Sequence, residues 1–334
     1  MRIIIPMAGW GSRLRPHTLK VPKPMVKIAG KPIVQRLVEN LAQSVSGEIE
    51  EINFIIREEF GKETEEKLME VAKEMGTKGI ISYQDSPEGT AHAIYCAKES
   101  LKGNVIVAFA DTLFKTDFKI DTSKDGVVWV NKIDDPSAFG VVKLDENNVI
   151  TDFVEKPKDF VSDLAIIGIY YFKSGEDLQT EIEYLLDNDL REKGEYQLTN
   201  ALESLKKKGA KFVPGEVIEW LDCGNKDACI YTNQRVLEIN KSFENFTFSK
   251  DFNNSIIIEP CFIGKDVKIR NSVIGPHVSI GDGTIVEDSV IKNTIIQENS
   301  EIANKVLENA MLGNFVKIQN TPEDLSLGDY TILK

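Results

Sequence analysis

Residues 2–24 read RIIIPMAGWGSRLRPHTLKVPKP. An apolar run of three isoleucines leads directly into a loop that contains two glycines and several basic residues. The first 38 residues hold eight lysines and arginines and no acidic residue, although the formal net charge of the chain is -13. Glycine lets backbone N–H groups approach phosphate oxygens, and fixed cations supply the countercharge. The stretch therefore predicts a buried strand that ends in an anion-binding loop.

The spacing of this loop excludes two common phosphate-binding motifs. A dinucleotide fingerprint requires a third glycine where Leu14 stands, and a Walker loop requires a Gly-Lys-Ser/Thr triplet that does not follow. The order Gly-x-Gly-Ser-Arg-Leu-x-Pro-x-Thr from Gly9, followed by Pro-Lys-Pro at 22–24, instead resembles the signature of the sugar-1-phosphate nucleotidyltransferases. One difference is Ala8, since the family usually has two consecutive glycines here.

The resemblance implies a Rossmann-like, mostly parallel α/β sheet and a defined reaction. Such enzymes transfer a nucleotidyl group from a nucleoside triphosphate to a sugar 1-phosphate and release pyrophosphate. The phosphate of the acceptor is already ionised at neutral pH, so the reaction requires charge neutralisation and alignment rather than a general base.

Composition limits the class of protein. The chain has 334 residues, 42% of them hydrophobic and 28% charged, which is enough for one large and one smaller domain. No stretch approaches the roughly 20 apolar residues of a membrane span, and the amino terminus reads as a strand and a binding loop rather than a signal peptide. We therefore expect a cytoplasmic protein with no membrane partner. The acidic balance argues against a nucleic-acid partner, which would need extended basic surface.

Cysteine and histidine usage argues against zinc and disulfides. The four cysteines contain no Cys-x-x-Cys pair, and only three histidines are present. We expect reduced, buried thiols.

Alternating apolar runs and amphipathic stretches predict a catalytic domain over residues 1–242. The expected strands are 2–6, 52–56, 79–83, 105–110 and 127–130. The expected helices are 32–43, 63–75, 176–186 and 228–239, with a hairpin over 139–155. A connector is expected at 243–254.

Residues 255–334 contain a repeat. Ser255, Ser272 and Ser289 each precede two aliphatic residues, at a period of 17. Within that period aliphatics step by about six, through isoleucines 257, 263, 269, 274, 280, 285 and 291. This spacing predicts a left-handed parallel β-helix of four or five coils with the isoleucines inside, whereas a β-sandwich would alternate with period two. The repeat resembles the hexapeptide tail found on many nucleotidyltransferases and acyltransferases.

The flat faces and open ends of such a tail favour a homo-oligomer, formed through the β-helix or through the catalytic domain. An alternative gives the tail its own acyltransferase activity with His277 as base. The tail is short for an acyl-CoA site, so oligomerisation is the favoured role.

By resemblance, two residues of the first stretch are catalytic. Arg13 would hold the triphosphate, and Lys23 would hold the α-phosphate or the incoming sugar phosphate. The nucleotide would lie against a loop made of Ala8, Gly9, Gly11 and Ser12.

Two aspartates are expected to bind Mg²⁺, because hard cations prefer oxygen ligands. Asp111 follows the apolar run 105–110, at the strand end where open α/β sheets bind ligands. Asp222 lies in Trp-Leu-Asp-Cys-Gly, which resembles the family's Trp-x-Asp-x-Gly segment. Each aspartate, taken alone, is also compatible with a helix cap.

A sugar-phosphate site is implied around Glu155-Lys156-Pro157, which resembles the family's Glu-Lys-Pro element. In that pattern Glu155 accepts hydrogen bonds from sugar hydroxyls and Lys156 contacts the phosphate. Gly140 lets the ring approach the backbone, and Gly168 follows in the family's order.

Residues 84–93 resemble the base-recognition segment. The Gln84 amide and the backbone of Gly89 can read thymine, uracil or guanine. Thr90 stands where the long thymidylyltransferases have leucine, and His92, at an expected helix start, is expected to have a structural role rather than a binding role. We expect dTTP and glucose 1-phosphate as substrates. UTP with glucose 1-phosphate, GTP with mannose 1-phosphate, and an inert regulatory homologue that only binds these ligands are the alternatives.

Overall fold

The computed structural model describes residues 1–117, 119–242, 244, 246–248, 251–321 and 325–332. The chain forms two compact units, one of Met1–Val26 with Lys31–Asn225 and one of Lys27–Gly30 with Lys226–Lys334. The sequence placed the end of the first domain at 242, so the structure divides the chain differently.

Helix α6 (Lys226–Asn240) accounts for this difference, because it belongs to the second unit. Its Asn233 side chain is buried and accepts hydrogen bonds from Ala29 N at 2.9 Å and from Ser279 Oγ at 2.7 Å. These contacts join the helix to the 27–30 segment and to the β-helix, and none of them is visible in the helical pattern itself.

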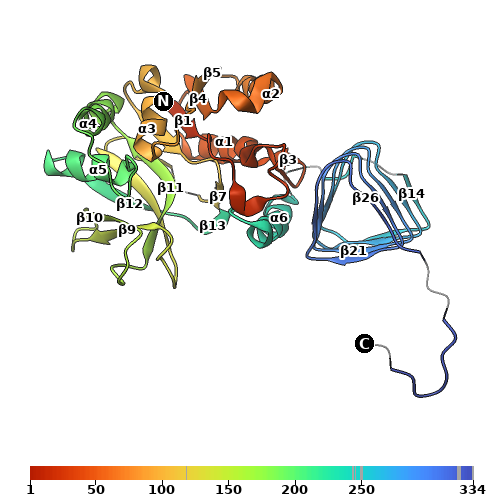
Figure 1. The fold of residues 1–334 in the computed structure, drawn as a ribbon. Coiled ribbons are helices and arrows are strands. Elements are labelled where there is room, and N and C mark those ends of the chain that lie inside the picture. Colours follow the sequence, from red (N-terminus) through yellow and green to blue (C-terminus); the bar gives the residue numbers. More distant parts are fainter. Residues whose placement is uncertain (118, 243, 245, 249–250, 322–324, 333–334) are drawn as a thin grey trace. The chain divides into compact units, whose positions relative to one another are not determined.

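The first unit is built on a nine-stranded sheet (Figure 1). The strands run in the order β10-β9-β11-β6-β1-β4-β5, and β8 pairs with both β11 and β12. Their bounds are β1 (Arg2–Pro6), β4 (Glu51–Ile56), β5 (Lys78–Tyr83), β6 (Val105–Ala108), β8 (Gly126–Lys132), β9 (Gly140–Leu144), β10 (Ile150–Glu155), β11 (Leu164–Phe172) and β12 (Phe212–Glu216).

The sheet is parallel on the side of β1 and mixed on the side of β11, where the β8–β12 pair is parallel and the other pairs are antiparallel. Strands β6, β1, β4 and β5 are mutually parallel, whereas β11 is antiparallel to β6, β8 and β9. The Rossmann-like α/β class is confirmed, and the 139–155 hairpin is present as β9 and β10. Strands β9 and β10 can pair in antiparallel fashion because a hairpin needs only a short turn, whereas two parallel strands need a longer crossover connection.

Helices cover the sheet on both faces. They are α1 (Ile33–Ser44), α2 (Gly61–Glu74), α3 (Thr90–Tyr95), α4 (Gly175–Asp187) and α5 (Leu198–Lys207). Helices α3, α4 and α5 bury their apolar stripes with sheet residues that include Ile4, Val107 and Tyr170. The alternate residues Ile3 and Ile5 are also fully buried, so β1 is enclosed on both sides.

Helix α5 was missed in the sequence, although its pattern is present there. Leu198, Ala201, Leu202 and Leu205 are all buried and have the i, i+3, i+4, i+7 spacing of an amphipathic helix.

Shorter elements complete the first unit and the 27–30 segment. They are η1 (Ser12–Leu14), η2 (Lys23–Met25), η3 (Glu58–Phe60), η4 (Lys98–Ser100), β2 (Lys27–Ile28), β3 (Lys31–Pro32), β7 (Thr112–Lys115) and β13 (Glu219–Asp222). In the part of the chain that the structure describes, no helix is both long and apolar enough to cross a membrane. None of the four cysteines, all of which the structure describes, forms a disulfide, and three of them are buried.

The second unit stacks short parallel strands into three sheets, the arrangement of a left-handed parallel β-helix (Figure 1). One sheet holds β14 (Asp251–Asn253), β17 (Lys268–Arg270), β20 (Ile285–Glu287), β23 (Glu301–Ala303) and β26 (Lys317–Gln319). The second holds β15 (Ile256–Ile257), β18 (Val273–Ile274), β21 (Val290–Lys292) and β24 (Val306–Glu308). The third holds β16 (Cys261–Ile263), β19 (Val278–Ile280), β22 (Ile295–Ile296) and β25 (Met311–Leu312).

The serines of the repeat join neighbouring coils. Ser272 N donates to Ser255 Oγ and Ser289 N donates to Ser272 Oγ, both at 3.1 Å. Consecutive serines of the repeat therefore lie one coil apart, so the period of 17 is the number of residues in one coil. The period then falls to 16, since Val273 aligns with Val290 but Val290 aligns with Val306.

The predicted inward position of Ile285 is wrong. Val286 is fully buried and aligns with Ile269, whereas Ile285 is only partly buried. The six-residue spacing predicts this position wrongly, because the pairing of each coil with the preceding coil decides which side chain points inward.

We expect Val286→Ala to lower the stability of the β-helix by about 2 kcal/mol, because it removes two buried methyl groups and leaves a cavity. Ile285→Ala is the matched control and should cost less than half of this. Thermal unfolding followed by circular dichroism measures both, and an equal or reversed order would contradict the inward assignment of Val286.

Candidate active site

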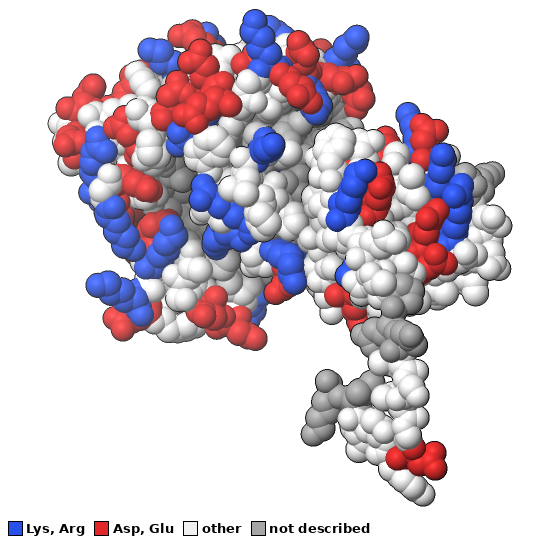
Figure 2. Space-filling view, turned by 45° about the vertical axis from the view of Figure 1, so that its right-hand side comes forward, with Lys and Arg blue, Asp and Glu red and all other residues white. Residues whose placement is uncertain are grey.

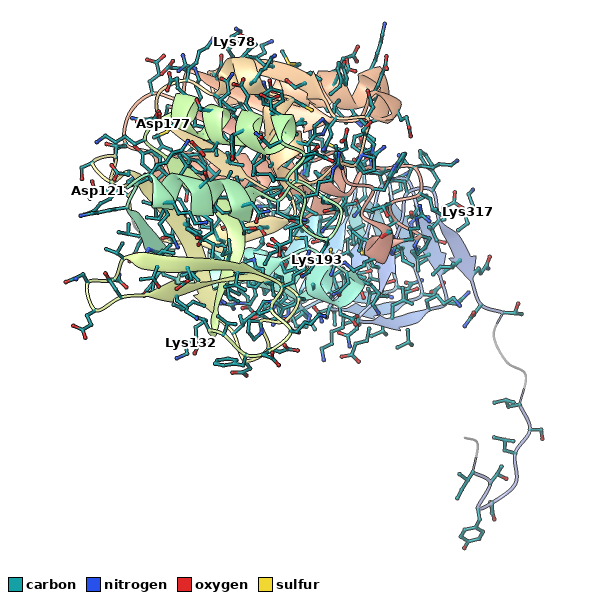
Figure 3. The ribbon with its side chains drawn as sticks, turned by 60° about the vertical axis from the view of Figure 1, so that its left-hand side comes forward. Lys78, Asp121, Lys132, Asp177, Lys193 and Lys317 are labelled. Atoms are coloured by element: carbon teal, nitrogen blue, oxygen red, sulfur yellow. The ribbon has the colours of Figure 1, made fainter. Side chains whose placement is uncertain are left out.

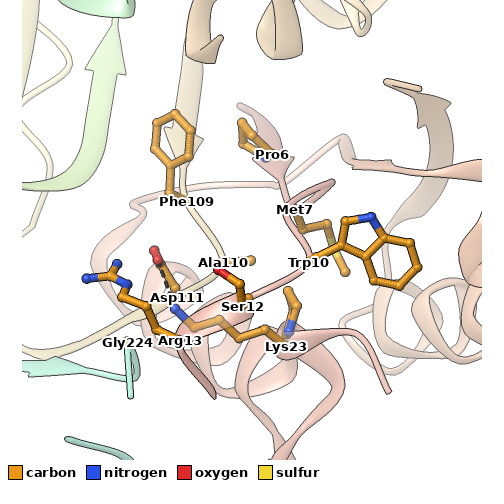
Figure 4. Close-up of a pocket in the computed structure, with 13 residues that line it drawn as sticks. Pro6, Met7, Trp10, Ser12, Arg13, Lys23, Phe109, Ala110, Asp111 and Gly224 are labelled. Carbon is orange, nitrogen blue, oxygen red and sulfur yellow. Dashed lines mark hydrogen bonds and ion pairs between the residues drawn. The ribbon is translucent and has the colours of Figure 1, made fainter. Parts of the chain in front are cut away.

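A pocket opens where the parallel strands of the first unit end. Loops from the carboxyl ends of β1 and β6 line it, together with Lys23 and Gly224 (Figure 4). From β1 come Gly9, Trp10, Gly11, Ser12 and Arg13, and from β6 come Phe109, Ala110 and Asp111. We call residues 7–13 the phosphate loop. Ligands commonly bind at this edge of open α/β sheets.

The two glycines of the phosphate loop differ in what requires them. Gly11 has φ 64°, and a Cβ there would lie 2.6 Å from Lys23 Cβ. A Cβ on Gly9 would meet no atom within 4 Å, so the backbone at Gly9 faces open space. The loop is closed behind Gly11 by Thr18, whose hydroxyl donates to Gly11 O at 2.8 Å. Gly11 thus serves the packing of the loop, and Gly9 leaves room for a ligand.

Lys23 and Asp111 form an ion pair inside the pocket. Lys23 is only 6% exposed, and its Nζ donates to Asp111 Oδ2 at 3.0 Å, shown by the dashed line in Figure 4. Arg13 and Ser12 are exposed on the same pocket, whereas Ala8 is buried. The two residues predicted to be catalytic, Lys23 and Arg13, therefore line the same pocket. The Lys23 ammonium is held by Asp111, whereas Arg13 is exposed to solvent.

Asp222 lies beside Asp111 because β13 pairs with β7 in antiparallel register. Cys223 N donates to Asp111 O at 3.0 Å, which continues the ladder. Burial raises the pKa of the Asp222 carboxyl, while the Gly224 backbone N–H and Lys23 lower it and the charge of Asp111 raises it further. A Cβ on Gly224 would lie 2.7 Å from Asp222 Oδ2, so a side chain there would displace the Asp222 carboxylate.

The two aspartates suit a magnesium ion that also binds phosphate. Among the described residues no group of three or more His, Cys, Asp or Glu side chains could hold a metal. Two carboxylates that leave the remaining positions to phosphate oxygens and water are typical of Mg²⁺ sites. The desolvated Asp222 next to a second carboxylate fits this role, because a divalent cation would offset both negative charges.

Three of the four predicted sugar-site residues, Gly140, Glu155 and Lys156, lie together at the hairpin of β9 and β10. Gly140 pairs with Glu155 across the hairpin, and a Cβ at Gly140 would lie 3.2 Å from Glu155 Oε2. Lys156 has φ 44°, and its Nζ lies 3.3 Å from Glu155 Oε1. Gly168, with φ 83°, instead packs on the end of β6, where its carbonyl accepts from Phe109 N at 2.9 Å. Gly168 therefore supports the strand that leads to Asp111.

Lys193 is a further cation at this hairpin that the sequence reading missed. It lies on the loop between α4 and α5 and is labelled in Figure 3. Its Nζ donates to the backbone carbonyls of Glu155 at 3.2 Å and Lys156 at 3.3 Å. The contact itself depends on the tertiary fold.

The segment 84–90, which we call the base segment, is held by contacts from both sides. Gln84 Nε2 donates to Gly89 O at 3.2 Å and lies 3.2 Å from His92 Nδ1, so His92 helps to hold the glutamine. Gly89 has φ 111°, and a Cβ would lie 2.5 Å from Tyr196 O. The Thr90 hydroxyl accepts from Leu198 N at 2.9 Å at the start of α5. Thr90 thus links the base segment to α5.

Charged side chains of both signs are interspersed over the face of the molecule in Figure 2. On the β-helix they form pairs between coils, such as Arg270 with Glu287 at 3.0 Å and Lys317 with Glu301 at 2.7 Å. Among the described residues on this face, no continuous basic surface of the kind that nucleic-acid binding requires is seen.

Comparison with known proteins identifies the family. Residues 2–239 match the model of the family described as nucleotidyl transferase. The chain therefore belongs to the nucleotidyl transferase family, and within it to the sugar-1-phosphate nucleotidyltransferases.

Three relatives match between about half and nearly all of the chain. The bifunctional protein GlmU of Methanococcus vannielii is 30% identical over 92% of this chain and 78% of its own length. The mannose-1-phosphate guanylyltransferase catalytic subunit beta of Drosophila melanogaster is 36% identical over 51% of this chain and 48% of its own. The glucose-1-phosphate thymidylyltransferase of Streptomyces antibioticus is 28% identical over 95% of this chain and 93% of its own.

A solved structure supports the fold. It is described as a glucose-1-phosphate thymidylyltransferase from Bacillus anthracis in complex with a sucrose. The TM-score is 0.60 at 24% identity, over 75% of this chain and 97% of that one.

The two glycines give a testable contrast. We expect Gly11→Ala to lower the melting temperature by several degrees, because it forces a Cβ into the left-handed region and against Lys23. Gly9→Ala should leave the melting temperature unchanged and weaken nucleotide binding, since its Cβ enters only the open pocket. Differential scanning calorimetry and titration with nucleotide separate the effects. Equal melting temperatures for the two variants would contradict the packing role of Gly11.

Proposed function

We propose that this protein transfers a nucleotidyl group from dTTP to glucose 1-phosphate, with Mg²⁺, and releases pyrophosphate. The observation that carries the proposal is the ion pair of Lys23 and Asp111 in a pocket that the phosphate loop also lines, with Asp222 brought beside Asp111 by the pairing of β13 with β7. Cations, paired carboxylates and open backbone N–H groups are what a reaction between two phosphates needs.

Each group has a role in this proposal. The phosphate loop and Arg13 bind the triphosphate, and Lys23 neutralises the phosphate at which bonds change. Asp111 and Asp222 hold the magnesium ion, which supplies positive charge to the phosphates when it is bound. Glu155, Lys156 and Lys193 lie where a sugar phosphate can meet both a carboxylate and cations.

The proposal also specifies which base and which sugar the protein recognises. Gln84 Nε2 already donates to Gly89 O and lies beside His92 Nδ1, so Gln84 Oε1 is the atom that would accept from the N3–H of thymine. The Streptomyces relative named as a thymidylyltransferase matches nearly the whole chain. The Drosophila relative is named as a mannose-1-phosphate guanylyltransferase subunit, so GTP with mannose 1-phosphate is an alternative substrate pair. UTP with glucose 1-phosphate is another alternative pair.

A panel assay tests the substrate pair. Pyrophosphate release is measured with dTTP, UTP, GTP and ATP, each against glucose 1-phosphate and mannose 1-phosphate. We expect dTTP with glucose 1-phosphate to have the highest kcat/KM. A tenfold advantage for another pair would reassign the substrates, and silence with every pair, despite nucleotide binding, would favour the inert regulatory homologue.

Removing either metal-binding charge should abolish turnover while the fold remains. We expect Asp111→Asn and Asp222→Asn to lower kcat by at least about 100-fold, because each removes a charge that holds the cation next to the phosphates. Glu63→Gln on the exposed face of α2 is the matched control and should retain full activity. Retained turnover in both aspartate variants, with unchanged magnesium dependence, would show that the metal lies elsewhere.

An acyltransferase role for the tail finds less support. His277 Nε2 lies 2.9 Å from Glu238 Oε1, and its backbone carbonyl accepts from Asn233. These contacts give His277 a structural role within the second unit. We propose instead that the β-helix serves a homo-oligomer, because Ile256, Val290 and Val306 are exposed and stand in register on one sheet.

The Val306→Lys variant tests self-association. A lysine in the middle of an apolar interface would have to bury an unpaired charge, so we expect a shift to a smaller species. Light scattering after size exclusion measures the mass. A mass equal to one chain in the unaltered protein would contradict the proposal.

A further inference from the structure

The order of the parallel strands places one turn between the two segments that contact a nucleotide in the proposed function. Strand β4 lies between β1 and β5 in the sheet. The phosphate loop follows β1 and the base segment follows β5. The turn after β4, residues 57–60, therefore begins at the same edge of the sheet, between the two.

Arg57, the first residue of this turn, is hydrogen-bonded to both segments. Its Nε donates to Ala8 O in the phosphate loop at 2.8 Å. Its Nη1 donates to Asp85 O in the base segment at 3.2 Å. The guanidinium is planar and its donors have a fixed geometry, so the two bonds set the separation of the two carbonyls.

The same turn makes further contacts with each segment. The guanidinium of Arg57 lies 5.9 Å from the ring centroid of Trp10, and the Phe60 ring meets Trp10 edge to face at 5.4 Å. On the other side Glu58 N donates to Asp85 Oδ1 at 3.1 Å. Trp10 itself lines the pocket and is 36% exposed, so this contact reaches the binding surface.

A nucleoside triphosphate joins its base and its phosphates covalently, so it can use both segments only when their separation is right. A displacement of about 1 Å costs a large factor in binding or rate. We propose that Arg57 is a positioning residue that fixes the phosphate loop relative to the base segment, and so sets both the affinity for nucleoside triphosphates and the discrimination among bases. The inference rests on the proposed function in taking a nucleotide as the ligand.

Binding of whole and partial ligands distinguishes positioning from simple support of the fold. Pyrophosphate can occupy the phosphate loop alone, whereas a nucleoside triphosphate must meet both segments. For Arg57→Met we expect the Kd of the preferred triphosphate to rise roughly tenfold and that of pyrophosphate to change less than twofold. The preference for that triphosphate over the next best should shrink by a similar factor, and KM for the sugar phosphate should stay within twofold.

Two further variants complete the experiment. Arg57→Lys keeps the charge and can reach one carbonyl at a time, so it should give an intermediate Kd. It also serves if Arg57→Met fails to fold. Arg2→Met is the matched control, because Arg2 Nη1 donates to the carbonyl of Lys102 at 2.7 Å and to neither segment. It should bind nucleotide like the unaltered protein. Isothermal titration calorimetry, with each ligand titrated into the protein in the presence of Mg²⁺, measures each Kd.

The outcomes separate this inference from the proposed function. Equal losses for pyrophosphate and triphosphate, or no loss for either, would overturn the positioning role while turnover by the unaltered protein still supports the function. Nucleotide binding without turnover by the unaltered protein, together with a selective loss in Arg57→Met, would support the positioning role and overturn the function. Failure of the unaltered protein to bind any nucleotide would overturn both.

Discussion

The buried ammonium of Lys23 is the constraint on which the site depends. A charge that is 6% exposed must be paired, and its partner Asp111 comes from a strand end 88 residues away in sequence. Gly11 has to be glycine because it packs on the stem of this lysine. The Lys23–Asp111 ion pair thus holds three segments together: the loop after β1, the turn η2 and the loop after β6. Asp222 lies next to them because β13 pairs with β7.

The sequence predicted those features that are written in local patterns. The isoleucine run of β1 is fully buried, and the glycines and basic residues after it do line a pocket. Asp111 was found because an acidic residue after a buried apolar run marks a strand end. The serine period of 17 revealed the β-helix because each serine bonds to its equivalent one coil away.

What the sequence reading missed depends on contacts between distant segments. Nothing local marks Arg57 as a residue that bonds to Ala8 and Asp85, since the relation exists only once β4 lies between β1 and β5. The assignment of α6 to the second unit likewise follows from Asn233 and its partners. Ile285 was placed inside because an average spacing was applied where register with the preceding coil decides. Helix α5 is different, because its amphipathic spacing was legible in the sequence and was overlooked.

The short segment 27–30 has a topological consequence. The chain enters the second unit after Val26, returns to the first at Lys31 and leaves it again after Asn225. Gly30 is part of this excursion, and a Cβ there would lie 2.1 Å from the ring of Phe262, so the segment is seated closely within its unit. A gene fusion or a protease that cuts only near Asn225 cannot separate the halves cleanly, because four residues of the β-helix unit remain attached to the catalytic half. The sequence of the first unit is therefore interrupted by four residues of the second, and recombination could exchange one tail for another only if the new tail accepted this same insert.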